Sequence, residues 1–267
     1  MTPVTPATRM FEFFQLEEDA GIAVATFERL PVNAFSYDAY RELAALAHQV
    51  EGSETIRVLI LAASPRSRAW IGGADLQELL ACDPDTRRQR YAFINETLPH
   101  FYHLDRPVIA AINGPAVGVG TSIAAMCDIR VASRKAFFAK PEIDRGLVGG
   151  GGTQFLRLGV PAGLVREMIY TARRVGADEM QAAGFIDHVV EPGQVMDKVM
   201  EIARLIAAKS LPALKANKLC NNAVEGLPWE EAYKLTQDYS AQLTGSVDGK
   251  EGIRAFLEKR RARYHDR

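Results

Sequence analysis

The chain has 267 residues, of which 48% are hydrophobic and 24% charged, so its apolar content suffices for a globular core. Acidic and basic residues are interspersed and sum to a net charge of -1, which argues against nucleic acid as a partner. The three cysteines are widely spaced, and no apolar run approaches the roughly 20 residues that a membrane span needs. We therefore expect a cytoplasmic protein with no membrane segment and no metal site.

The first half of the chain alternates apolar strands with helices. The wholly apolar strands are of the buried, parallel kind, and two of them run through a glycine-rich turn into a helix. This βαβ rhythm predicts an α/β fold. The expected elements are strands at 11–16, 22–27, 58–62, 108–112 and 129–132 and a helix at 37–50.

The second half is mostly helical. Apolar periodicity predicts helices at 161–171, 178–183 and 197–208, with a short extended piece at 185–190. These patterns divide the chain into a flexible leader at 1–9, a sheet-containing core at 10–195 and a helical region at 196–267.

Two glycine-rich turns, at 69–76 and 112–122, each lead from an apolar strand into a helix. Backbone N–H groups at a helix N-terminus have no partner within the helix and stabilise negative charge. Two such turns that face one point would form an oxyanion hole, the device that activates a carbonyl in acyl-group chemistry.

Glu142 is the candidate catalytic carboxylate. It follows Pro141 and the apolar run 136–139, so its segment should lie against the core. A carboxylate in such surroundings suits proton transfer near neutral pH. The residue types alone fit an ion pair with Arg145 about equally well.

The glycines by themselves do not indicate a cofactor. Gly118 and Gly120 lack the third glycine of a dinucleotide-binding fingerprint, because Ile123 stands at that position. Ser122 is not in a Gly-x-Ser-x-Gly turn, which argues against a serine hydrolase.

Taken in chain order, these motifs resemble the crotonase (enoyl-CoA hydratase/isomerase) superfamily. The segments that carry the resemblance are 33–34, 70–76, 109–120, 126–129, 141–143, 146–147, 151–154, 183–187 and 252–260. The resemblance implies a spiral of ββα units with a C-terminal helical region. It implies an acyl-CoA thioester as substrate, with no metal and no separate cofactor. It also implies a homotrimer, or a hexamer that is a dimer of trimers, assembled through 196–267.

The resemblance also suggests roles for individual residues. The N–H groups of Ala74 and Val119 should form the oxyanion hole, in agreement with the two glycine-rich turns. Arg68 should lie near the nucleotide end of CoA, and Phe256 and Lys259 should reach the CoA of a neighbouring subunit. The complete set expected to bind substrate or CoA is Arg68, Gly72, Asp75, Leu76, Phe256 and Lys259.

One position departs from the family pattern. Hydratases of this superfamily carry two glutamates; Glu142 matches the one that delivers a proton, and Ser122 replaces the one that activates water. A hydroxyl is no general base at neutral pH, and acid–base help is worth about 10²–10⁴-fold, so hydration should be slow. We therefore expect a shift of 3-enoyl-CoA to 2-enoyl-CoA with Glu142 as the sole acid/base.

Three alternatives stay open. An ordered water could support hydration with Glu142 alone, and a hydrolytic or ring-modifying reaction on an unusual acyl group is also compatible with the family. The third is a catalytically weak protein that only binds acyl-CoA. The acyl group itself depends on the side chains of the pocket, which should include part of the stretch 79–101.

Overall fold

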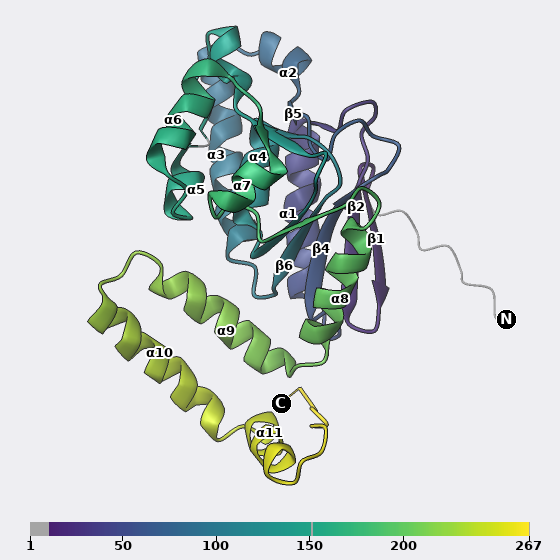
Figure 1. The fold of residues 1–267 in the computed structure, drawn as a ribbon, viewed down its shortest axis with the longest axis vertical. Helices are drawn as coiled ribbons and strands as arrows, with labels where there is room; N and C mark the ends of the chain where they lie inside the picture. The colour runs from purple at the N-terminus through teal and green to yellow at the C-terminus, as the bar shows by residue number, and fades with distance from the viewer. Residues whose placement is uncertain (1–10, 151, 267) are drawn as a thin grey trace, which may run out of the picture.

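A six-stranded sheet forms the centre of the fold, in a computed structural model that describes residues 11–150 and 152–266 (Figure 1). Its strand order is β1-β2-β4-β6-β8-β11; β1 and β2 are antiparallel, and the other neighbours are parallel. These strands are β1 (Phe14–Asp19), β2 (Ile22–Phe27), β4 (Val58–Ala63), β6 (Val108–Ile112), β8 (Ile129–Ser133) and β11 (His188–Val190). The strands expected from the sequence are present, although β1 lies nearer to its turn than predicted.

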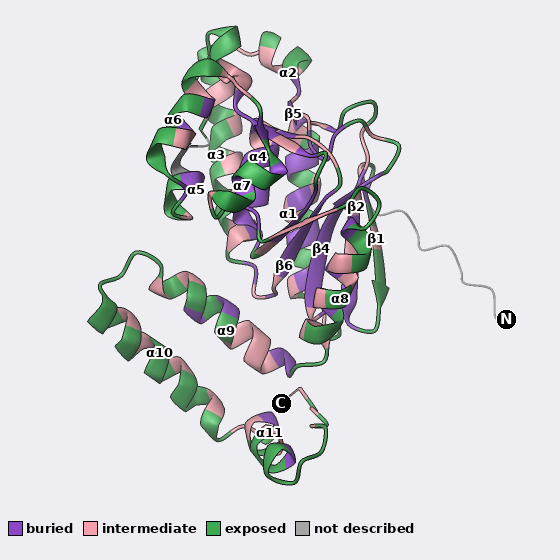
Figure 2. Ribbon diagram, viewed as in Figure 1, coloured by how far each residue is buried: buried purple, intermediate pink, exposed green. Residues whose placement is uncertain are grey.

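Alternate residues of the central strands face two separate hydrophobic clusters. Leu59 and Leu61 of β4 belong to the larger cluster, which includes the apolar side of α1 (Tyr37–Glu51). Val58 and Ile60 face the smaller cluster and pack with residues of α8 (Val195–Ala207). Because successive side chains of a strand point to opposite faces, an all-apolar strand requires cover on both sides. Figure 2 shows the buried strands between these helices.

Two small sheets position the glycine-rich turns. One consists of β3 (Ala34–Phe35) and β5 (Gly73–Ala74), and the other of β7 (Ala116–Val117), β9 (Phe137–Ala139) and β10 (Val175–Gly176). A bridge between Ile71 and Ala116 connects the two turns, and the parallel register of β7 and β9 sets Val117 opposite Ala139. The segment after β9 therefore lies beside the second turn.

The other helices include one that the sequence patterns did not reveal, α3. They are α2 (Leu76–Leu80), α3 (Pro84–Tyr102), α4 (Val119–Met126), the 3₁₀ helix η1 (Pro141–Arg145), α5 (Gly152–Arg157), α6 (Ala162–Thr171), α7 (Ala177–Ala182), α9 (Leu211–Val224), α10 (Trp229–Thr244) and α11 (Val247–Leu257). Among the described helices, none has the length and apolarity that crossing a bilayer would require.

The C-terminal helices α9, α10 and α11 extend away from the sheet (Figure 1). Lys218 of α9 joins this region to the core through an ion pair with Asp128, at 2.5 Å. Helix α8 packs on the sheet, and the expected division of the chain at 195/196 stays a prediction. The expected leader, 1–9, lies outside the described residues.

Candidate active site

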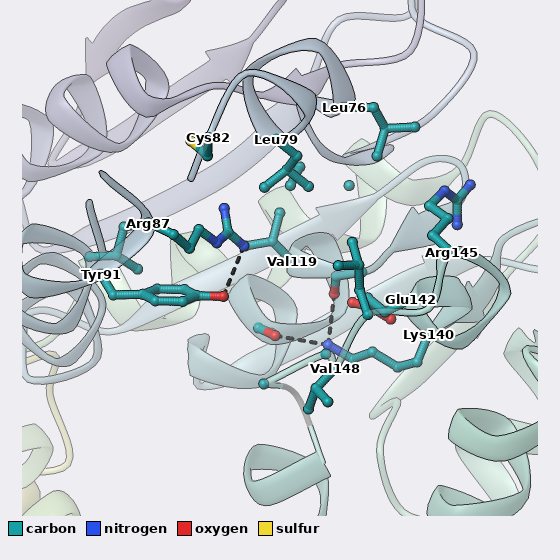
Figure 3. A pocket seen from close by; sticks show the side chains of 18 of the residues that line it. Leu76, Leu79, Cys82, Arg87, Tyr91, Val119, Lys140, Glu142, Arg145 and Val148 are labelled. Carbon is teal, nitrogen blue, oxygen red and sulfur yellow. Dashed lines mark hydrogen bonds between the residues drawn. The ribbon is translucent and has the colours of Figure 1, made fainter. Parts of the chain in front are cut away.

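A cavity of about 590 Å³ lies at the two glycine-rich turns. Its wall is formed by the turns themselves, by α2 and α3, by the start of α4 and by the segment 140–150 (Figure 3). The volume is in the range of small-molecule sites, and the lining is mainly apolar with a few polar groups. The stretch after residue 79 does line the cavity, through side chains of α3 such as Arg87, Tyr91 and Leu98.

The first turn is held by a buried asparagine. The Asn33 side-chain amide donates to the carbonyl oxygens of Ala69 (3.2 Å) and Trp70 (3.0 Å), and its main-chain carbonyl accepts from Gly72 N. Asn33 is fully buried, so these bonds satisfy polar groups that water does not reach. They fix the strand that ends at Ala74.

The second turn packs against the first. Gly118 has φ +55°, and a side chain there would place a Cβ 3.6 Å from Gly73 Cα. The Gly118 N–H donates to Ala139 O (2.9 Å), and Val117 N donates to Ile71 O (2.9 Å). Val119 is the first residue of α4, where an N–H lacks an intrahelical acceptor, and it lines the same cavity as Ala74. The structure thus brings together both residues predicted for the oxyanion hole.

Glu142 projects from η1 into the cavity (Figure 3). Its carboxyl group lies against two glycines: a Cβ on Gly118 would be 3.2 Å from Oε1, and one on Gly149 would be 2.5 Å from Cδ. Among the described residues Oε2 is buried and has no hydrogen-bond partner. Arg145 instead donates to Pro141 O (2.8 Å), so the ion pair considered from the sequence is not formed.

Ser122 has a partner that the sequence reasoning missed. Lys140 Nζ donates to Ser122 Oγ (3.0 Å) and to Gly118 O (2.8 Å), and Figure 3 shows both bonds at the lysine nitrogen. Ser122 lies one turn of α4 beyond Val119, and both residues line the cavity. The only sequence signal was a lysine directly before Pro141-Glu142, after an apolar strand.

The ammonium group of Lys140 is enclosed by protein. Lys140 is 2% exposed, and its Nζ lies 5.9 Å from the ring centroid of Phe155. Within the described part of the chain it forms no ion pair, and burial lowers its pKa from 10.5 to about 8, although the charge of Glu142 opposes this shift. Burial therefore brings the pKa of Lys140 to within reach of the physiological range.

The residues predicted to bind substrate or CoA are not all in one place. Gly72 and Leu76 line the cavity. The carboxylate of Asp75 caps α2 and pairs with Arg29 (2.6 Å). Burial by itself raises the pKa of this carboxyl, but the hydrogen bonds and the charge of Arg29 outweigh burial, so the pKa lies below its ordinary value. Arg68 is exposed and does not line the cavity. Contact of Asp75 or Arg68 with CoA stays a prediction.

Phe256 and Lys259 lie at the C-terminal end of the molecule. Phe256 is 83% exposed on α11, and Lys259 follows that helix. Figure 1 places α11 far from α2 and α3, which flank the cavity. Neither residue contacts the cavity of its own chain, so the expectation that they act on a neighbouring subunit stays a prediction.

One group of side chains among the described residues could hold a metal ion, namely His48, Glu51 and His100. These residues lie on α1 and α3, and none of them lines the cavity. Their atoms are thus separate from Glu142, and the expectation of a reaction without metal stays a prediction.

Comparisons with known proteins agree with this geometry. Residues 17–267 match the family described as enoyl-CoA hydratase/isomerase. A short-chain-enoyl-CoA hydratase of Clostridium acetobutylicum is 33% identical, over 92% of this chain and 95% of that protein. An indene-carboxyl-CoA hydrolase of Rhodococcus jostii is 31% identical, over 92% and 94% respectively. The crystal structure of an enoyl-CoA hydratase of Mycobacterium smegmatis superposes with a TM-score of 0.89 at 29% identity, over 95% of this chain and 99% of that one.

Proposed function

Because the chain belongs to the enoyl-CoA hydratase/isomerase family and has the crotonase fold, we propose that it shifts the double bond of a 3-enoyl-CoA to position 2. Glu142 removes the proton from C2 while the thioester oxygen accepts hydrogen bonds from the N–H groups of Ala74 and Val119. Each such donor contributes on the order of 10²–10³ in rate, because it stabilises the charge that develops as the proton leaves. The reaction needs no metal and no separate cofactor.

The observation that carries the proposal is that, of the two carboxylates in the described lining of the cavity, only Glu142 has a buried oxygen without a hydrogen-bond partner. Glu142 has a buried, unpartnered oxygen and lies against the turn that bears Val119. The other carboxylate of the described lining, Asp83, caps α3, and hydrogen bonds from Thr86 lower its pKa. Ser122 occupies the position where a hydratase would have its second glutamate. One free carboxylate suits proton removal at one carbon better than activation of water.

Hydration of a 2-enoyl-CoA is the second candidate. It is favoured by the names of relatives such as the short-chain-enoyl-CoA hydratase, which align over nearly the whole chain. Hydration would require Glu142 and an ordered water to act without a second carboxylate. Because the second carboxylate is missing, we favour the double-bond shift over hydration.

The test supplies purified protein with a 3-enoyl-CoA and, separately, a 2-enoyl-CoA, and follows the absorbance of the conjugated thioester. A rise with the first substrate and little change with the second supports the double-bond shift. A rapid fall with the second substrate refutes it in favour of hydration. Glu142→Gln should abolish turnover and retain CoA binding, whereas a protein that only binds acyl-CoA would be unaffected.

The assembly belongs to the same proposal. Large apolar side chains are exposed on α10 and α11, among them Trp229 (71%), Phe256 (83%) and Leu257 (74%). Such a surface is typical of an interface. We expect α9–α11 to build a homotrimer, or a dimer of trimers, in which Phe256 and Lys259 approach the CoA of a neighbour. Sedimentation equilibrium distinguishes these states from a monomer.

A further inference from the structure

The pairing of Ser122 and Lys140 gives the cavity a second group that can carry a proton. Both residues line the cavity and are buried, with 8% and 2% of their surfaces exposed. Lys140 Nζ donates to Ser122 Oγ at 3.0 Å. A hydroxyl that accepts a hydrogen bond through its oxygen keeps its own proton available for another acceptor. The hydroxyl of Ser122 can therefore donate into the cavity.

The placement of this hydroxyl relative to Glu142 suits a second role. Ser122 and Val119 are three residues apart on α4 and so lie on one face of the helix. The carboxyl group of Glu142 lies beside Gly118, the residue that precedes α4, and a Cβ on Gly118 would be 3.2 Å from Glu142 Oε1. A thioester held by the Val119 N–H would thus have the Glu142 carboxylate on the side of the helix N-terminus and the Ser122 hydroxyl one helical turn along α4.

We propose that Ser122 is the proton donor at the far carbon of the substrate and that Lys140 polarises Ser122 and returns its proton. This inference rests on the proposed double-bond shift and changes one part of it. Glu142 removes the proton at C2, but a different group supplies the proton at C4. Ser122 touches the substrate, and Lys140 is a positioning residue that acts through it.

The Glu142 carboxylate takes the C2 proton, and the C2–H electron pair enters a dienolate whose oxygen is held by the two main-chain donors. An electron pair of the dienolate forms the C4–H bond with the hydroxyl proton of Ser122, as the double bond moves to C2–C3. Ser122 Oγ takes a proton from the Lys140 ammonium. Glu142 is then neutral and Lys140 uncharged, and exchange with water restores both.

The electrostatics of Lys140 are suited to this duty. Burial lowers the pKa of Lys140 to about 8, so the ammonium form is present at neutral pH and gives up a proton readily. An acid is most effective in proton transfer when its pKa lies near the working pH. The Gly118 carbonyl and the ring of Phe155 also contact the ammonium, and its bond to Ser122 Oγ provides a route for a proton to the hydroxyl.

A purely structural role for Lys140 is the competing explanation, because its bond to Gly118 O also braces the second turn. A double-mutant cycle separates the two roles. If Lys140 acts through Ser122, each single variant, Ser122→Ala or Lys140→Met, should lower kcat by about 10²-fold or more. The double variant should lower kcat by no more than a single variant does, because both substitutions interrupt the same proton transfer. The kcat of the unmodified protein should also fall above about pH 8, where Lys140 is uncharged, and this fall should be absent in both single variants.

Proton exchange at C2 provides the matched control. A saturated acyl-CoA in deuterated buffer exchanges its C2 protons through Glu142 and the oxyanion hole alone, without a donor at C4. Ser122→Ala leaves the Lys140 bond to Gly118 intact, so it should retain exchange within about threefold while it loses turnover. Exchange and turnover that fall in parallel would overturn the proposal, as would a Ser122→Ala variant with unchanged kcat and pH profile.

The same experiment keeps this inference distinct from the proposed function. If the unmodified protein hydrates a 2-enoyl-CoA and does not shift a 3-enoyl-CoA, the double-bond shift has failed. Hydration needs its proton at C2, beside Glu142, so the relay to C4 fails together with the double-bond shift. If the double-bond shift is observed but the cycle shows no coupling between Ser122 and Lys140, the relay alone is overturned.

Discussion

A methyl group at position 149 tests whether the Glu142 carboxylate must stay where the structure places it. A Cβ on Gly149 would lie 2.5 Å from Glu142 Cδ and 2.7 Å from Oε1, whereas ordinary contact begins at 3.4 Å. The carboxyl group must therefore retreat by about 1 Å in Gly149→Ala, and a misplacement of this size costs about 10²-fold in rate. Because the displaced atoms are the end of a flexible side chain, the free energy of unfolding should change little.

The assay measures C2 proton exchange of a saturated acyl-CoA and thermal unfolding on the same samples. Gly150→Ala is the control, because a Cβ there meets no heavy atom of the described residues within 4 Å, and it should retain most of the exchange. Full exchange in Gly149→Ala with unchanged stability would show that Glu142 does not act from this position. Loss of folding would show that Gly149 is needed for the backbone rather than for the carboxylate.

Three further predictions concern packing and pH. Gly120→Ala would place a Cβ 2.5 Å from Ile71 O, so it should destabilise the protein by about 1–3 kcal/mol in denaturant unfolding. Gly163→Ala should not, because its Cβ has no heavy atom of the described chain within 4 Å. Lys218→Met removes the ion pair with Asp128, whose carboxylate is exposed and still accepts from Val108 N, so it should cost about 1 kcal/mol, and an unchanged midpoint would show that this ion pair does not hold α9 on the core. For Lys140, with a pKa of 10.5 unfolded and about 8 folded, the unfolded state binds more protons between these values. Stability relative to Lys140→Met should therefore rise by about 3 kcal/mol from pH 8 to 10.5 and stay constant below pH 8.

The central strands could be predicted because their local pattern is unambiguous. Val58–Ala63 is wholly apolar and buried on both faces, which few other structures permit. The helix α3 was missed because its sequence is rich in arginine and other polar residues, and only Thr97 and Phe101 of it are buried. A helix that buries so little gives no clear apolar period.

In the site, too, the features with a local sequence pattern could be predicted, and those that depend on the pairing of distant segments could not. Main-chain features such as the turns at Ala74 and Val119 follow from glycine placement, which is visible in the sequence. The contact of Lys140 with Ser122 depends on the pairing of β7 with β9, and each of these strands has only two or three residues. No local pattern marks so short a pairing, so the lysine beside Glu142 could not be assigned to the serine.

The bonds that shape the second turn run between main-chain atoms, with Gly118 N on Ala139 O and Val117 N on Ile71 O. Neither bond involves the side chains at 122 and 140, so the backbone that we propose activates the thioester does not depend on which residues stand there. Under that proposal, descendants of such a protein could acquire a new reaction by exchanging one or two side chains while they keep the step that enolises the substrate. The division of labour between backbone and side chains thus makes this cavity a favourable starting point for divergence.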